Sequence, residues 1–164
     1  MQRTRMTFWA AVAAVVLFAG PVVATPPSGV SGTVWARASF ADPTDIKLKI
    51  THGNEEVILA PNARQTVMQS IVITPSGHTG WHSHPGPVVV LVKSGELTFY
   101  DSEGPTCTGR TYTAGQAFID RGQGHVHFAS NTGAVDTELW VTYFDVPPGG
   151  AFRLDAADPG NCAF

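Results

Sequence analysis

Short apolar or alternating runs, each bounded by turn-forming residues, occupy most of this chain and restrict its fold more than any other feature. The run "IKLKIT" at 46–51 places Ile46, Leu48 and Ile50 on one face and two lysines on the other, as in a half-buried strand. Because the runs are short and few segments show helical spacing, we predict an all-β fold, an antiparallel sandwich or barrel. Further strands are expected at "TVMQSIVIT", "VVVLVK", "ELTFYD", "RTYT", "QAFID", "HVHFAS" and "TELWVTYFDV", with Ser94 and Gly95 as a tight hairpin turn.

The first 24 residues have the layout of a secretory signal peptide. Arg3 and Arg5 give a basic start, residues 8–20 form an uncharged apolar stretch, and small residues ending at Ala24 suit cleavage. The alternative is an N-terminal membrane anchor, but the apolar stretch is shorter than the roughly 20 residues of a spanning helix. We therefore expect a secreted, extracellular protein with no membrane attachment after cleavage near Ala24.

The rest of the chain is long enough for one domain with a single core. We divide it into a linker and first strand (25–40), a β-barrel domain (41–146) and an irregular C-terminal tail (147–164). The lead at 25–32 is rich in proline, glycine and serine, which is typical of a loose linker.

Cys107 and Cys162 are the two cysteines of the chain. In a secreted protein such a pair is typical of a disulfide, here one that ties the tail to the barrel domain. The alternatives are two free thiols or a contribution to a metal site, and the distance in sequence from the histidines makes ligation the weaker of these.

The charge distribution argues against a nucleic-acid partner. Without Arg3 and Arg5, the ten basic residues fall to eight against thirteen acidic ones, a net charge of −5. The basic residues are scattered singly, whereas phosphate binding needs concentrated positive charge. We expect a small molecule as the ligand or substrate.

Two His-x-His pairs, His82 with His84 and His125 with His127, carry the chemistry of this sequence. Residues i and i+2 of a strand point to the same face, so each pair directs two imidazoles to one side. An unpartnered polar ring in an apolar interior costs free energy, and a metal ion is the partner we expect. The two pairs are far apart in sequence, so only a fold that brings two strands face to face, such as a jelly roll, would unite them.

These motifs resemble those of the cupins, a superfamily of double-stranded β-helix (jelly-roll) barrels that includes small bacterial single-domain members. The family motifs are G-x5-H-x-H-x3,4-E-x6-G and G-x5-P-x-G-x2-H-x3-N. The first is matched at His82, His84 and Gly95, and the second at Gly124, His127 and Asn131. The resemblance covers residues 64–146 and implies the cupin fold.

The resemblance implies that His82, His84 and His127 bind one divalent metal ion, with Fe, Cu, Zn, Mn and Ni as candidates. Val88 stands where the family has its glutamate ligand. We therefore expect a site with no carboxylate, which keeps the full double charge of the ion, favours anionic ligands and lacks an internal base. The alternative is a metal-free cupin whose histidines are held by hydrogen bonds.

His125 is a candidate fourth ligand if residues 125–127 are extended; otherwise it points to solvent at the barrel mouth. The candidates for the wall of a substrate pocket are Gln69, Val88 and Phe128. No catalytic residue is assigned from the sequence.

Two functions remain open at this stage. The first is a dioxygenase-like metalloenzyme, because all-histidine iron sites occur among cupin dioxygenases. The second is a non-catalytic module that binds a small ligand or a metal, which the missing glutamate favours. The resemblance also allows a homodimer, although no feature of the sequence marks an interface.

Overall fold

The computed structural model describes residues 24–51, 55–103 and 107–162. The predicted signal peptide, apart from Ala24, lies outside the described residues. Among the described residues no helix is long and apolar enough to cross a membrane. Twelve strands account for the regular structure of this part of the chain. They are β1 (Ser28–Ser39), β2 (Ile46–Ile50), β3 (Glu56–Ala60), β4 (Gln65–His78), β5 (His82–Ser83), β6 (Val88–Ser94), β7 (Glu96–Asp101), β8 (Thr108–Thr113), β9 (Ala117–Asp120), β10 (His127–Ser130), β11 (Thr137–Val146) and β12 (Leu154–Asp155).

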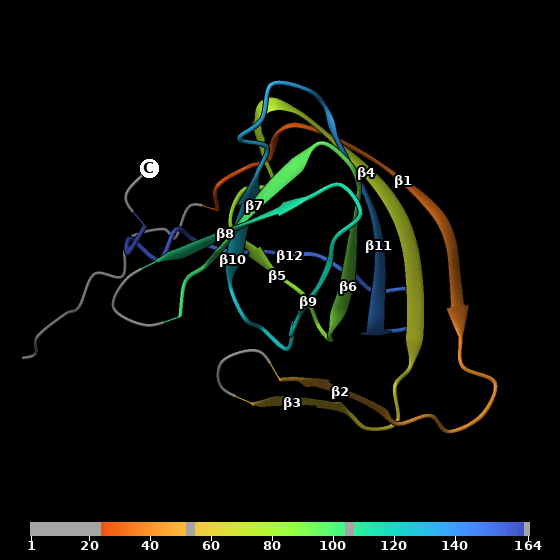
Figure 1. Cartoon of the computed structure of the whole chain (residues 1–164). Helices are drawn as coiled ribbons and strands as arrows, with labels where there is room; N and C mark the ends of the chain where they lie inside the picture. The colour runs from red at the N-terminus through yellow and green to blue at the C-terminus, as the bar shows by residue number, and fades with distance from the viewer. Residues whose placement is uncertain (1–23, 52–54, 104–106, 163–164) are drawn as a thin grey trace, which may run out of the picture.

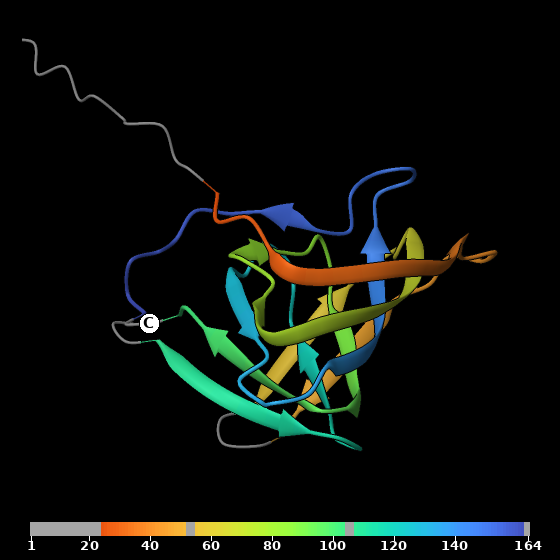
Figure 2. The same cartoon turned by 90° about the horizontal axis from the view of Figure 1, so that it is seen from above.

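The antiparallel strands curve around a common interior and form a nearly closed barrel (Figures 1 and 2). One wall follows the order β1-β4-β11-β6-β9, and the other follows β8-β7-β10-β5-β12. The pair Ser130↔His78 joins β10 to β4 and so connects the two walls. This arrangement confirms the predicted cupin-type double-stranded β-helix.

The core fills the barrel because buried and more exposed residues alternate along β6 from Val88 to Lys93 and along β11 from Thr137 to Phe144. Val88, Val90 and Val92 of β6 point inward, and Leu139 and Val141 of β11 face them from the paired strand. The intervening residues face outward and are more exposed, as expected for a sheet with one buried face. Other members of the buried cluster are Val67, Ile73, Leu97, Ala129, Tyr143 and Val146.

The predicted hairpin at Ser94 and Gly95 is wrong. β6 pairs with β9 and β11, whereas β7 pairs with β8 and β10, so the two strands lie in opposite walls. Gly95 has φ +75°, and a Cβ there would lie 2.7 Å from the carbonyl oxygen of Asp136. Gly95 therefore lies where the chain crosses from one wall of the barrel to the other in little space. The hairpin does not form because β6 and β7 each pair with strands distant in sequence.

The β2–β3 hairpin lies beneath one end of the barrel (Figure 1). Gln123 Nε2 donates a hydrogen bond of 2.6 Å to the carbonyl oxygen of Leu59, and Arg121 forms an ion pair with Glu56. These contacts attach the hairpin to the loop that follows β9.

Both ends of the described chain are more ordered than the sequence suggests. Residues 28–32, expected in a loose linker, belong to β1, which pairs with β4 over most of its length. The tail contributes β12, in which Leu154 pairs with Ser83 and Asp155 pairs with His82. Tail and first strand thus lie against the segment that carries the first histidine pair.

The predicted disulfide between Cys107 and Cys162 is confirmed, with a Cα–Cα distance of 4.7 Å and a sequence separation of 55 residues. It joins the end of the described tail to the loop before β8. Closing a loop of this length removes conformational entropy from the unfolded chain.

We predict that the double variant Cys107→Ser with Cys162→Ser loses roughly 4 kcal/mol of unfolding free energy on the chain-entropy model. Urea denaturation with and without reductant measures the change. Reductant should lower the midpoint of the native protein and leave that of the double variant unchanged. An unchanged midpoint for the reduced native protein would contradict this prediction.

Candidate metal centre

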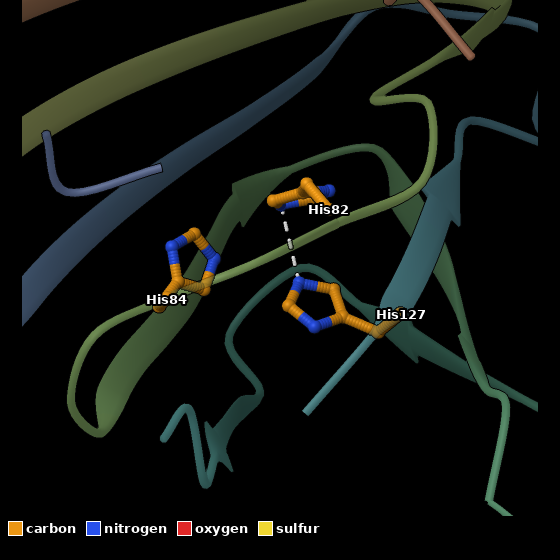
Figure 3. A group of neighbouring side chains, drawn as sticks. All are labelled: His82, His84 and His127. Carbon is orange, nitrogen blue, oxygen red and sulfur yellow. Dashed lines mark hydrogen bonds between the residues drawn. The ribbon is translucent and has the colours of Figure 1, made fainter. Parts of the chain in front are cut away.

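Three buried histidines meet inside the barrel (Figure 3). His82 begins β5, His84 follows two residues later, and His127 begins β10. His82 and His127 are direct partners in the antiparallel ladder, which brings the two motifs together. The ring centroids lie 4.2–5.1 Å apart in all three pairs. The predicted convergence of these three side chains is therefore present in the structure.

Backbone carbonyl groups orient each of the three rings. His82 Nδ1 lies 2.9 Å from the carbonyl oxygen of Gly80, and His84 Nδ1 lies 2.6 Å from that of Phe152. His127 Nδ1 lies 3.3 Å from the carbonyl oxygen of His125. A carbonyl only accepts, so the proton of each neutral ring is on Nδ1 and the Nε2 lone pair is free.

The free Nε2 atoms point toward one another. Those of His82 and His127 lie 3.1 Å apart, joined by the dashed line in Figure 3. A proton on either Nε2 makes this contact a hydrogen bond, whereas with both protons on Nδ1 the two lone pairs face each other and suit a shared cation. Donor atoms that share one ion at about 2.1 Å are typically about 3 Å apart, which is the spacing seen here.

Burial keeps these rings neutral. It lowers the pKa of His82 well below its ordinary value, and the charges of its neighbours lower it further. Burial also lowers the pKa of His84, and it lowers that of His127 to about 4 despite the nearby Asp120 carboxylate. Neutral imidazole is the form that binds metal ions, so no proton has to be displaced at neutral pH.

Asp120, at the end of β9, brings a carboxylate to the same place. Its Oδ2 lies 3.6 Å from Nε2 of both His84 and His127, and its side chain is 1% exposed. No hydrogen-bond partner of this buried oxygen is found among the described residues. Burial alone would raise the pKa of Asp120, but His127, His125 and the Gly122 backbone N–H lower it, so the group is ionised.

The expectation of a site without a carboxylate is therefore wrong. Asp120 of β9 pairs directly with Val88 of β6, the position at which the family motif has its glutamate. The Asp120 carboxylate thus comes from the neighbouring strand β9, at the position paired with Val88, where the motif glutamate is absent. The only signal in the sequence is an aspartate that ends the apolar run "QAFID", and its importance depends on strand pairing.

His125 does not join the three converging rings. Gly122, Gln123 and Gly124 all have positive φ, so the chain turns before His125 instead of extending through it. Its Nε2 hydrogen-bonds to Asp101 Oδ1 at 2.8 Å. Its Nδ1 lies 3.8 Å from Asp120 Oδ1, so His125 contacts the far side of the carboxylate. The alternative of a solvent-facing ring is wrong, because the side chain is 5% exposed, and a ligand role for His125 stays a prediction.

Two adjoining cavities give access to the cluster. The inner one, of about 50 Å³, is lined by the three histidines, Asp120 and Val88 among others. The outer one, of about 240 Å³, adds Gln69 and residues of β1 and of the tail. Val88 thus lines the inner cavity and Gln69 the outer one, and their role in a substrate pocket stays a prediction.

Phe128 lines neither of these cavities, contrary to expectation. It follows His127 in β10, and successive side chains of a strand point to opposite faces. Its ring instead packs against His78 and Trp81.

Two groups of donor atoms could hold a metal ion. One consists of His82, His84 and His127, and the other of Asp120, His125 and His127; the donor atoms of each group lie within 4.8 Å of one another. The free Nε2 lone pairs and the unpartnered Asp120 Oδ2 fit a cation, which would satisfy them all. Without a metal ion, the 3.1 Å contact between His82 Nε2 and His127 Nε2 is a hydrogen bond, and Asp120 Oδ2 has no hydrogen-bond partner among the described residues.

No protein-family model matches the sequence, and no curated protein matches it. Among solved structures, the chain is similar to an oxalate oxidase in complex with the substrate analogue glycolate, at 26% identity and a TM-score of 0.45. This match covers 53% of this chain and 45% of that one. A double-stranded β-helix protein from Klebsiella pneumoniae matches at 23% identity and a TM-score of 0.45, covering 76% of this chain and 92% of that one. The polyketide cyclase RemF from Streptomyces resistomycificus matches at 15% identity and 0.45, covering 58% and 63%.

The chain spans less than half the length of the oxalate oxidase, and TM-scores below 0.5 carry no argument about function. The strand pairing of the barrel, with two histidine segments that meet inside it, defines a cupin-type protein. What such a barrel does depends on its site and not on its fold.

We predict that the stabilising effect of His125 depends on pH. Burial lowers the pKa of His125, but the Asp101 and Asp120 carboxylates outweigh this and raise it from 6.5 to about 9. A raised folded-state pKa stabilises the fold fully below pH 6.5, and this stabilisation is lost as the pH rises through 9. Asp101→Asn should therefore lower the melting temperature of the metal-free protein more at pH 6 than at pH 10.

Thermal unfolding at the two pH values measures this difference, and an NMR titration of the His125 ring measures the pKa. The exposed Asp136→Asn is the matched control and should show no pH-dependent difference. Equal losses for Asp101→Asn at both pH values would count against the ion pair.

Proposed function

We propose that this protein is a secreted metalloenzyme in which His82, His84, His127 and Asp120 hold one divalent ion. Its reaction is the oxidation of a small anionic organic molecule by O2. The observation that carries the proposal is the convergence of three neutral imidazole nitrogens and one unpartnered carboxylate oxygen at the end of an accessible cavity. A bound redox-active ion would supply Lewis acidity and electron transfer to O2.

Asp120 changes the electrostatics expected for this site. One carboxylate reduces the charge of a divalent ion and its ligands from +2 to +1, so the site still attracts anions but less strongly. The ionised carboxylate also provides a proton acceptor for a substrate that must be deprotonated. His125, hydrogen-bonded to Asp101, supports Asp120 from the opposite side.

Neighbouring residues position the substrate and exclude water. Burial raises the pKa of Tyr143 far above its ordinary range, so its hydroxyl stays protonated and donates to Gln69 Oε1 at 2.9 Å. Apolar side chains, including Val90, Leu97 and Phe99, line the rest of the inner cavity. A dry wall of this kind strengthens the electrostatic interactions within the site.

The donor set suits several first-row ions. Three imidazoles and a carboxylate are compatible with Fe, Cu, Zn, Mn and Ni. Ferrous ion oxidises readily outside the cell and zinc has no redox chemistry, so the proposed oxidation in a secreted protein favours Cu, Mn and Ni. The proposed secretion is supported by the signal-like N-terminus and by the Cys107–Cys162 disulfide, which is typical of oxidising compartments.

The non-catalytic binding module remains the alternative. Its main support in the sequence was the absence of a carboxylate and of a base. Asp120, which is paired with Val88, removes this support because its carboxylate can serve as a metal ligand or as a base. A small-molecule ligand is common to both functions.

We predict that His82→Ala abolishes stoichiometric binding of a divalent ion. The expected loss of affinity exceeds the roughly 10–100-fold that removal of an outer-shell partner costs. Elemental analysis of the native protein and zinc titration of the metal-free protein provide the measurements. His78→Ala is the matched control, because His78 hydrogen-bonds to the backbone N–H of Gly80 and lies outside the cluster. Metal retained by His82→Ala would refute the ligand assignment.

We predict that the metal-loaded protein consumes O2 with a member of a panel of small organic acids, thiols, diketones and phenols. Asp120→Asn preserves the shape of the side chain but removes its charge, so O2 uptake should fall at least tenfold. An oxygen electrode measures uptake, and Asp136→Asn serves as the control. Stoichiometric zinc in the native protein with no turnover on any member would reject the oxidase and favour the binding module.

A further inference from the structure

The C-terminal tail brings one basic side chain, Arg153, to the entrance of the metal site. The outer cavity is lined by His82 and His84 on its inner side and by Phe152 and Arg153 on the tail side. The pairing of β12 with β5 holds this part of the tail in place, since Asp155 is the ladder partner of His82. Arg153 therefore belongs to the site although it lies outside both sequence motifs.

Hydrogen bonds position the guanidinium but leave one nitrogen free. Nε donates to Asp155 Oδ1 at 2.9 Å, and Nη2 donates to the carbonyl oxygen of Thr79 at 2.8 Å. Among the described residues no acceptor is found for Nη1. The Asp155 carboxylate is 60% exposed, so solvent screens its partial neutralisation of the arginine.

The positive charge of Arg153 acts within the site. Its side chain lines the same cavity as His82 and His84. With a divalent metal ion bound to the histidines, an anion between the metal ion and the Arg153 guanidinium would face positive charge on both sides. Arginine also offers paired donors that match the geometry of a carboxylate.

Gln69 adds a second donor to the same cavity. Its Oε1 accepts the hydroxyl of Tyr143, which leaves the Nε2 amide group to donate. Gly32 of β1 makes room for this amide, because a Cβ at that position would lie 2.5 Å from Gln69 Nε2. The free polar groups that we identify on Arg153 and Gln69 are thus donors only, and donors alone select an acceptor such as an anion.

The size and the remaining walls limit the ligand. A volume of about 240 Å³ equals that of roughly eight water molecules in the liquid, which suits a small molecule and excludes a polymer. Pro27, Val30 and Ile71 contribute apolar surface beside the donors. The cavity therefore fits a short organic chain with one anionic end.

We propose that Arg153 and Gln69 form a carboxylate-binding subsite that selects small organic acids and orients them toward the histidine cluster. This inference rests on the proposed function, because it names the substrate class of the same site. Arg153 is a specificity-determining residue in this assignment, and the tail is a functional part of the barrel.

The test compares acetate with acetamide, its neutral isostere, by calorimetric titration of the zinc-loaded protein. Arg153→Gln should weaken acetate binding at least tenfold and change acetamide binding by less than twofold. Arg153→Lys retains the positive charge but not the paired N–H donors. Its acetate affinity should lie between those of the native protein and of Arg153→Gln. Loss of tail packing alone would weaken both ligands equally, so the acetate-to-acetamide ratio reports the charge.

Two further variants make the test independent of the fold of the tail. Arg37→Gln is the matched control, because Arg37 also donates to the tail, at the carbonyl oxygen of Gly150, but does not line the cavity. It should leave both affinities unchanged. Gln69→Glu leaves Arg153 in place, removes a donor that both ligands can use and adds a negative charge, so it should weaken acetate binding more than acetamide binding.

Unchanged acetate binding in Arg153→Gln, or no preference of the native protein for acetate over acetamide, would overturn the subsite. Zinc stoichiometry is measured on the same samples. If the native protein binds none of Fe, Cu, Zn, Mn and Ni, the proposed function fails, and the acetate-to-acetamide comparison on the metal-free protein still decides the role of Arg153.

Discussion

The site of this protein depends on three hydrogen bonds from histidine side chains to backbone carbonyl groups. The carbonyl oxygens of Gly80, Phe152 and His125 hold the Nδ1 protons of the three buried rings. All three Nε2 atoms therefore converge, and those of His82 and His127 lie 3.1 Å apart. A cation shared by the three nitrogens would satisfy their lone pairs together, which is why the cluster indicates a metal centre more strongly than the number of histidines does.

The carbonyls come from three separate parts of the chain, so the orientation of the rings depends on the complete fold. Gly80 precedes β5, His125 precedes β10, and Phe152 belongs to the tail. The tail is kept near by its pairing with β5 and by the Cys107–Cys162 disulfide. Stability and site geometry are thus coupled, since release of the tail removes the partner of His84 and displaces Arg153.

Asp120 and Arg153 place opposite charges at opposite sides of the histidine cluster. Asp120 approaches from β9 in the inner cavity, while Arg153 approaches from the tail in the outer one. Such a charge distribution would orient an anionic ligand. Arg153 and the metal ion would attract its negative end, and the Asp120 carboxylate would repel it. The proposed oxidation of a small organic acid is consistent with this asymmetry.

Local patterns in the sequence determined the fold class and the three histidines. Alternation with period two specifies strands with one buried face, and the His-x-His pairs, together with the cupin motifs, specified His82, His84 and His127. These features are local, because they depend on side chains one or two residues apart.

Only the tertiary structure decided the rest of the site. Asp120 lies opposite Val88 through a strand register, and Arg153 reaches the entrance through the pairing of a tail that shows no strand pattern. The passage at Gly95 likewise follows from pairing between distant segments. Contacts of this kind depend on which strands become neighbours, and a pattern of nearby residues carries no information about that choice.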